Sequence, residues 1–235
     1  MTDQKKKRIA ILQPAYIPWK GYFDLIRMVD EFIFLEEVQY TTDWKNRNLI
    51  KTPQGLKWLT IPVKRLGLAD KIADIKVAHE NWRRKHWLSF EHNYSKAPHF
   101  EENRHWLQEL YLHCDELSLH KIDAFFIEAI NKKLGISTPL IWSSLYEPQG
   151  TKAERVLDIC KKTGAAVYLS GPAAKAYLDE TLFQAAGIRV EWMDYTGYPE
   201  YHQLFPPFEH GVTILDLLLN EGPNTVNYMK TLITG

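Results

Sequence analysis

Short apolar runs alternate with amphipathic segments along this chain. Residues 9–12 form an apolar run bounded by polar residues, which predicts a buried strand. From Gly21 onward apolar residues recur near helical spacing, and residues 32–35 are the next apolar run. Strand, helix and strand in this order predict two parallel strands joined by a right-handed crossover.

The middle of the chain changes from strand signals to helix signals. A turn signal at residues 53–55 predicts a hairpin over 48–63, and alternation over 72–77 predicts another short strand. Helical patterns follow at 81–94, 100–113 and 117–134. We therefore predict one domain over residues 1–235 with a helical insertion at 81–134.

The last hundred residues return to alternating strands and helices. Thr151 and Glu154 have the spacing of a capping box at a helix start. The expected strands are 138–142, 166–169 and 188–193; the expected helices are 152–163, 181–186, 212–219 and a closing helix at 224–233. The predicted fold class is α/β, a Rossmann-like mostly parallel sheet with the helical insertion.

Polar and aromatic side chains follow the first predicted strand. Residues 13–20 contain two prolines, so they form a rigid loop rather than helix or central strand. In α/β sheets ligands bind beyond the carboxyl ends of strands. Gln13, Trp19 and Tyr22 are candidate binding residues there, and Tyr16 is a candidate catalytic residue. The alternative is a stiff turn whose aromatic rings pack on the core.

The segment after the second predicted strand is dense in hydrogen-bonding groups. Arg47 and Lys51, with Lys45, suit a phosphate or carboxylate, and Asn46 and Asn48 suit polar ligand edges. A solvated loop is the alternative interpretation.

Two later loops carry similar groups. Ser170, Gly171 and Lys175 follow a strand and suit an oxyanion or phosphate, although an ordinary helix N-cap explains them equally well.

The loop at 194–203 supplies candidates for substrate contact and catalysis. Tyr195, Tyr201 and Gln203 are candidate binding residues. His202 is a candidate general base, because histidine titrates near neutral pH, and a structural histidine is the alternative. Asp216 caps a helix, pairs with a cation or orients that base.

Composition narrows the class of protein. Lys and Arg number 29, as do Asp and Glu, so the net charge of zero argues against a duplex nucleic-acid binder that works through a basic face. Cys114 and Cys160 are far apart, and the histidines have no zinc-like spacing, so no metal is predicted. No run spans a bilayer, and residues 1–7 lack a signal core, so we expect a cytoplasmic protein.

Spaced motifs along nearly the whole chain resemble the WbqC-like protein family. They are residues 13–23, 44–48, 50–52, 58–63, Tyr94, 97–98, 168–172, 198–199, Tyr201, Gln203 and 216–222. Thr213 and Leu219 stand where a serine and a phenylalanine are expected, and both are mild exchanges. The resemblance implies a role in bacterial O-antigen, lipopolysaccharide or related surface-polysaccharide biosynthesis, where nucleotide-linked amino sugars are built and acylated.

The first loop also resembles, in layout, the His-x-Gly-His loop of nucleotidylyltransferases. Trp19 and Tyr22 stand where those enzymes have histidines, so the resemblance implies nucleotide binding more readily than adenylyl transfer.

These observations leave three functions open. The first is a transferase that delivers an acyl or aminoacyl group to a nucleotide-linked amino sugar, with the donor small or held on a carrier protein. The second is a nucleotidylyltransferase-like enzyme that binds a nucleoside triphosphate. The third is a sugar-nucleotide-binding protein without turnover. No cofactor is certain beyond a nucleotide-linked or acyl donor.

Overall fold

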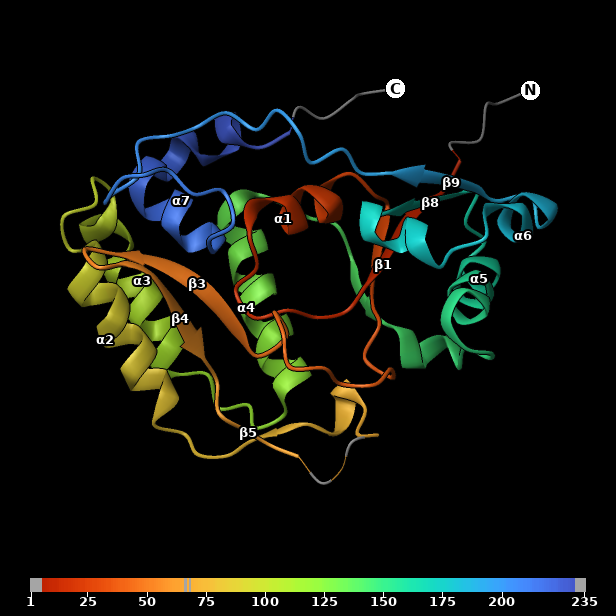
Figure 1. The fold of residues 1–235 in the computed structure, drawn as a ribbon, viewed down its shortest axis with the longest axis horizontal. Helices are drawn as coiled ribbons and strands as arrows, with labels where there is room; N and C mark the ends of the chain where they lie inside the picture. The colour runs from red at the N-terminus through yellow and green to blue at the C-terminus, as the bar shows by residue number, and fades with distance from the viewer. Residues whose placement is uncertain (1–5, 66, 68, 231–235) are drawn as a thin grey trace.

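The computed structural model describes residues 6–65, 67 and 69–230, and these residues are organised around a parallel sheet (Figure 1). Its strands are β1 (Arg8–Leu12), β2 (Glu31–Phe34), β7 (Leu140–Trp142), β8 (Val167–Ser170) and β9 (Arg189–Trp192). They lie in the order β7-β2-β1-β8-β9, and every neighbouring pair is parallel. The predicted α/β class and its mostly parallel sheet are confirmed.

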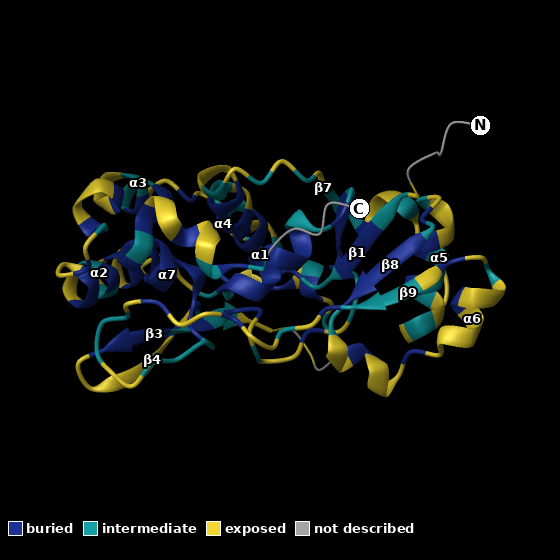
Figure 2. Cartoon of the chain, turned by 90° about the horizontal axis from the view of Figure 1, so that it is seen from above, coloured by how far each residue is buried: buried dark blue, intermediate teal, exposed yellow. Residues whose placement is uncertain are grey.

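Helices cover both faces of this sheet because successive side chains of a buried strand point to opposite sides. Ala10, Phe32 and Phe34 pack with α1 (Lys20–Arg27), α4 (Leu119–Leu134) and α7 (Ile214–Glu221). Ile9, Ile11 and Ile33 pack with α5 (Lys152–Lys162) and α6 (Glu180–Ala185). Figure 2 shows β1 and β8 in dark blue, as buried strands, while the edge strands β7 and β9 are mostly teal, as partly exposed ones.

Two further helices and a hairpin lie beside the sheet. The predicted helices at 81–94 and 100–113 are observed as α2 (Trp82–Tyr94) and α3 (Phe100–Leu112), and α4 matches the third. The hairpin consists of β3 (Arg47–Thr52) and β4 (Gly55–Thr60), joined at the predicted turn. That residues 81–134 are an insertion stays a prediction.

Several short elements differ from the predicted ones. The strand expected at 72–77 is a 3-10 helix, η1 (Ile72–Asp74), before a two-residue strand, β6 (Lys76–Val77), which pairs with β5 (Val63–Lys64). The reason is local, since the Asp74 carboxylate and the Lys71 backbone form a reciprocal cap. The other short 3-10 helices are η2 (Ser143–Tyr146), η3 (Pro172–Ala176) and η4 (Gly222–Tyr228).

Both ends of the chain extend beyond the described residues. A closing helix was expected at 224–233. The structure has the 3-10 helix η4 over Gly222–Tyr228, and residues 231–233 lie outside the described residues. Residues 1–5 of the polar start also lie outside. The capping box at Thr151 and Glu154 is confirmed at the start of α5.

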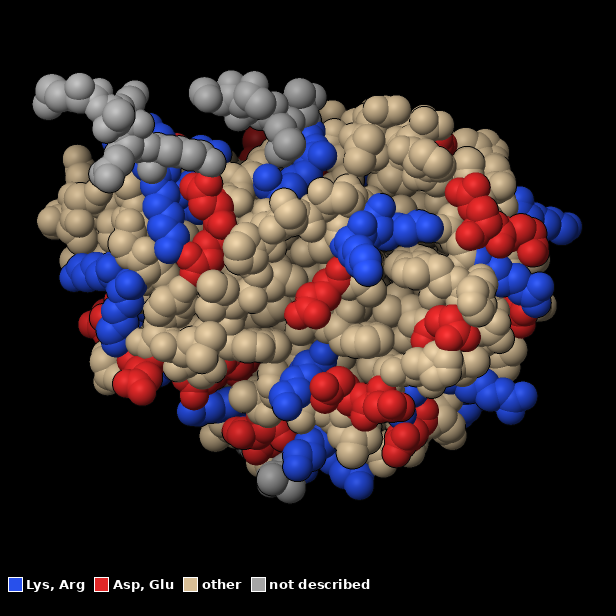
Figure 3. Space-filling view, turned by 180° about the vertical axis from the view of Figure 1, so that it is seen from behind, with Lys and Arg blue, Asp and Glu red and all other residues tan. Residues whose placement is uncertain are grey.

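The surface charge is mixed, as the net charge of zero suggests. Acidic and basic side chains lie side by side on the face shown in Figure 3. Among the described helices, none has the length and apolar character required to cross a membrane.

The loop between β1 and α1 is shaped by unusual backbone requirements. Ile17 has a positive φ of 37°, and Asn48 donates hydrogen bonds to the carbonyls of Tyr16 and Ile17 at 3.0 and 2.8 Å. The Trp19 indole lies over Gly21 so closely that a Cβ there would fall 2.4 Å from a ring carbon. The Trp-Lys-Gly sequence is therefore a packing requirement.

Replacement of Gly21 by alanine should destabilise the fold because the new methyl group displaces the Trp19 ring. We expect the free energy of unfolding to fall by about 1–3 kcal/mol, measured by urea denaturation. Gly171→Ala is the matched control, since Gly171 has ordinary φ of −71° and its Cβ would lie 3.7 Å from the nearest atom. Equal stability of the two variants would contradict this account of Gly21.

Candidate functional site

A pocket of about 480 Å³ opens at the carboxyl end of β1. Three segments meet there: the loop after β1, the segment before β3 and the residues before α7. Its lining residues are Leu12, Gln13, Pro14, Ala15, Pro18, Trp19, Tyr22, Asp43, Trp44, Lys45, Asn48, His210 and Gly211. From β1 the chain adds β2 and β7 on one side of the sheet, and later adds β8 and β9 on the other side. Open α/β sheets bind ligands at the point where the strand order changes direction in this way.

One wall of the pocket is aromatic. The Trp19 ring lies edge-on to Tyr195, with ring centroids 5.0 Å apart, and Tyr198 lies 5.7 Å from Trp19. The Tyr22 hydroxyl donates to the Gln13 carbonyl at 3.0 Å, and burial raises the pKa of Tyr22 well above its usual value. This wall therefore offers ring faces and a neutral phenol to a ligand.

Another part of the pocket wall, formed by Asp43 and Lys45, carries a compensated charge. Lys45 Nζ lies 2.7 Å from Asp43 Oδ2 and 2.9 Å from the Thr41 hydroxyl. Burial raises the pKa of Asp43, but hydrogen bonds from Lys45 and Thr41 outweigh this effect, and the net pKa is lowered. The pair presents polar atoms to the pocket with little net charge.

His210 is a pocket residue that the sequence analysis missed. Its Nδ1 is buried and has no hydrogen-bond partner among the described residues, and its ring packs edge-on against Phe208 at 4.6 Å. Burial and the nearby charge of Lys20 lower its pKa, so the imidazole is neutral at pH 7 and able to accept a proton. A lone histidine in an irregular loop has no spacing pattern that would have revealed it.

A buried hydrogen-bond network positions the loop that carries His210. Gln203 donates to Asp216 at 2.8 Å and to the carbonyl of Glu209 at 3.1 Å, and accepts from the backbone N–H of Glu209 at 2.8 Å. Asp216 also accepts from the Tyr201 hydroxyl at 2.6 Å and the Tyr94 hydroxyl at 2.7 Å. Asp216, Tyr201 and Gln203 thus lie behind the pocket and position its wall.

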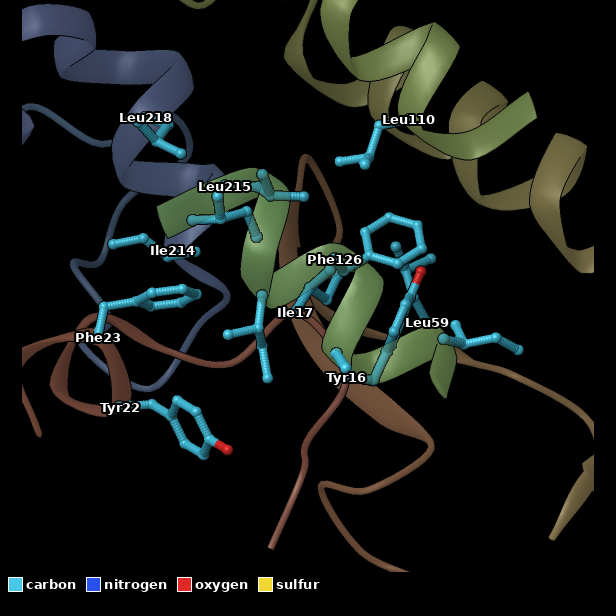
Figure 4. Packing of buried hydrophobic residues seen from close by; sticks show 14 of the residues in the cluster. Tyr16, Ile17, Tyr22, Phe23, Leu59, Leu110, Phe126, Ile214, Leu215 and Leu218 are labelled. Atoms are coloured by element: carbon cyan, nitrogen blue, oxygen red, sulfur yellow. The ribbon is translucent and has the colours of Figure 1, made fainter. Parts of the chain in front are cut away.

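Tyr16, predicted as catalytic, faces the core. Its hydroxyl lies 2.9 Å from His86 Nδ1 and 2.8 Å from the Tyr111 hydroxyl. Figure 4 shows its ring beside Phe126, while Tyr22 lies apart, beyond Ile17. Tyr16 is therefore a core residue, and it is not among the residues that line the pocket.

The predicted cations do not form one cluster. The Arg47 guanidinium lies 4.5 Å above the Trp58 ring, and Lys51 Nζ donates to the carbonyl of Pro207. Lys175 Nζ lies 5.3 Å from the Trp192 ring. Of the cations Lys45, Arg47 and Lys51 predicted to hold a phosphate, Lys45 lines the pocket, while Arg47 and Lys51 have these other partners.

The remaining predicted residues have other partners. Asn46 donates to the carbonyl of Ile61, and the Ser170 hydroxyl donates to Tyr168. Gly171 lies 3.7 Å from the Tyr195 hydroxyl, measured from the position that its Cβ would take. His202 is exposed and does not line the pocket; its backbone N–H donates to Glu221. The pocket is lined by the predicted binding residues Gln13, Trp19, Tyr22, Lys45 and Asn48.

His86 should make stability pH-dependent. Burial lowers its pKa to about 4 from 6.5, so between these values the unfolded chain binds a proton that the folded chain does not. Stability should fall by up to about 3 kcal/mol as the pH drops through this window. Urea denaturation at pH 4 to 7 measures how the unfolding free energy changes with pH. This dependence should be weaker in His86→Leu than in the wild-type protein, and unchanged in the exposed control His92→Gln. Identical slopes for all three proteins would contradict the assignment.

The Gln203 contacts predict a second stability effect. Gln203→Leu removes a donor from the buried Asp216 carboxylate and both links to Glu209, so we expect a loss of about 2 kcal/mol in unfolding free energy. Gln54→Leu, at the exposed hairpin turn, should change it by less than about 0.5 kcal/mol. Denaturant titration measures both, and a neutral Gln203→Leu would show that the network does not support the loop.

Comparison with known proteins places these residues in a family. The model of the WbqC-like protein family matches residues 13–228. An uncharacterized protein of Mycobacterium tuberculosis, Rv1507c, is 46% identical over 226 residues, which cover 95% of this chain and 98% of that relative. No solved structure matches the chain significantly. The family match includes the loop after β1, the hairpin and the residues around Asp216, and the chain belongs to the WbqC-like protein family.

Proposed function

We propose that this protein is a transferase of bacterial surface-polysaccharide biosynthesis that binds a nucleotide-linked amino sugar in the pocket beyond β1. The observation that carries the proposal is the pocket itself, in which aromatic rings, amide groups and a neutral histidine converge. Small-molecule sites are mostly apolar cavities of about 300–1,000 Å³ with a few convergent polar groups. Family membership supports the pathway.

Acyl or aminoacyl transfer fits the groups present. The sugar amine would attack the acyl carbonyl, forming the C–N bond while the bond to the leaving group breaks. His210 would accept the amine proton, because it lines the pocket and is neutral at pH 7. Gln13 lines the same cavity and is our candidate donor to the developing oxyanion.

Ligand recognition would use both walls. We assign direct contact to Gln13, Trp19 and Tyr22, and an indirect role to Asn48, which holds the loop after β1, and to the network that holds the His210 loop. The first turn of α1 has no side-chain cap at Trp19, so its N–H groups suit an anionic part of the ligand. Either a small acyl donor or a carrier protein is compatible with this arrangement.

The strand order favours a second candidate function. The strand order winds outward on both sides of the β1–β8 pair. In a Rossmann-like enzyme of this kind, the loop after β1 and η3 after β8 would be the two nucleotide-binding loops. A nucleotidylyltransferase-like enzyme would bind a nucleoside triphosphate with magnesium. Stabilisation by that ligand alone, with none by nucleotide sugars, would favour this second function.

The test compares the two histidines near the end of the chain. The purified protein is incubated with nucleotide-linked amino sugars and acyl or aminoacyl donors, and product is followed by mass spectrometry. His210→Gln should lower turnover about 100-fold or more while the variant still binds the nucleotide sugar. His202→Gln replaces the histidine first predicted from sequence, which lies outside the pocket.

Each result has a definite meaning. Loss of turnover in His210→Gln alone supports the pocket as the reaction site. Loss in His202→Gln alone would return the base to the exposed loop and overturn the assignment of His210. A ligand at 100 times its Kd should raise unfolding free energy by about 2.7 kcal/mol, so thermal stabilisation identifies binders before any assay. No binding by any nucleotide sugar would overturn the proposed function.

A further inference from the structure

Two exposed tryptophans stand at the mouth of the pocket. Trp44 lines the pocket and is 47% exposed, and its ring centroid lies 5.1 Å from that of Trp58, which is 41% exposed. The Arg47 guanidinium lies over the Trp58 ring. We call Trp44, Trp58 and Arg47 the indole shelf.

The fold does not account for this exposure. The backbone of Trp44 is used, since its carbonyl accepts from the N–H of Tyr16 at 3.1 Å, but its indole remains largely in solvent. Leu56, on the same face of β4 as Trp58, is also 47% exposed. Neighbouring exposed apolar side chains on a soluble protein commonly mark a binding surface.

The pocket is too small to enclose the whole of the proposed ligand. A nucleotide sugar joins a base, a ribose, a diphosphate and a sugar, and is longer than the drug-sized molecules that cavities of this volume enclose. A cavity of about 480 Å³ therefore holds one end of the molecule, and the other end lies at its mouth.

The position of the proposed general base, His210, sets the orientation of the ligand. The amine that reacts must lie near His210, so the amino sugar occupies the pocket and the base lies outside. Trp44 is shared by the pocket and the shelf, so a chain of atoms leaving the pocket passes its exposed ring. Indole faces stack on planar bases, and Arg47 has a buried Nε without a partner among the described residues.

We infer that the indole shelf is a nucleobase subsite, in which Trp44 stacks on the base of the nucleotide sugar while Trp58 and Arg47 support that ring and offer hydrogen bonds to the base edge. This inference rests on the proposed function and assigns the orientation of its ligand. Stacking of this kind contributes about 1–3 kcal/mol per base, which corresponds to roughly 5- to 150-fold in affinity.

The experiment measures binding by calorimetry with three probes: the tightest-binding sugar nucleotide from a panel of uridine, thymidine, guanosine and cytidine derivatives, its nucleoside diphosphate, and its sugar 1-phosphate. Trp44→Ala should raise the Kd of the two base-containing probes about tenfold and leave that of the sugar 1-phosphate unchanged. Trp44→Phe, which keeps a ring, should recover most of the affinity. Tyr177→Ala, an exposed aromatic residue outside the pocket, is the matched control.

The outcomes separate the inference from the function on which it rests. Normal affinity of Trp44→Ala for the sugar nucleotide, combined with weaker binding by Tyr22→Ala in the pocket, would overturn the nucleobase subsite and leave the proposed function standing. Equal weakening of all three probes would also overturn it, because Trp44 would then contact the sugar. If the wild-type protein binds none of the panel, both proposals fail.

Discussion

The buried carboxylate of Asp216 holds together the part of the molecule that surrounds the pocket. It joins α7 to α2 through Tyr94 and to the preceding loop through Tyr201 and Gln203. Burial raises the pKa of Asp216, and the hydrogen bonds from these side chains oppose that rise. A buried carboxylate is tolerated only when its oxygens are satisfied, so these elements must assemble as a unit.

This constraint reaches the pocket through one side chain. Gln203 donates to Asp216 with its amide nitrogen, and it also binds both the backbone N–H and the carbonyl of Glu209. These bonds fix the position of the residues just before α7. His210 then projects into the pocket next to the loop after β1. The proposed general base is thus positioned by residues that do not line the pocket.

The loop after β1 is rigid for a different reason. Asn48 satisfies two of its carbonyls, the Trp19 ring lies on Gly21, and the Tyr16 hydroxyl is bound in the core. Few degrees of freedom remain in this loop, which would favour the affinity of the proposed ligand. The same interactions explain several of the spaced motifs: they preserve the shape of the loop as much as the chemistry of its side chains.

Local pattern was enough to predict much of the fold and part of the site. Apolar runs, helical spacing, the turn at 53–55 and the capping box at Thr151 depend on neighbours within a few residues, and all of these elements are observed. The strand expected at 72–77 is observed only at residues 76–77, because the Asp74 carboxylate accepts from the backbone N–H of Lys71 and favours a 3-10 turn at 72–74. Gln13 and Tyr22 were found as pocket residues because they follow a buried strand.

The sequence by itself determined the order of strands and helices, the parallel sheet and the family. The periodicity of apolar residues depends on near neighbours in the chain, and a family match adds up many short motifs. Only the tertiary structure decided which side chains meet. It turns Tyr16 into the core, leaves His202 in solvent and brings His210 to the pocket. The direction of a side chain in an irregular loop depends on its φ and ψ angles, and long-range partners such as Asn48 and Asp216 set those angles.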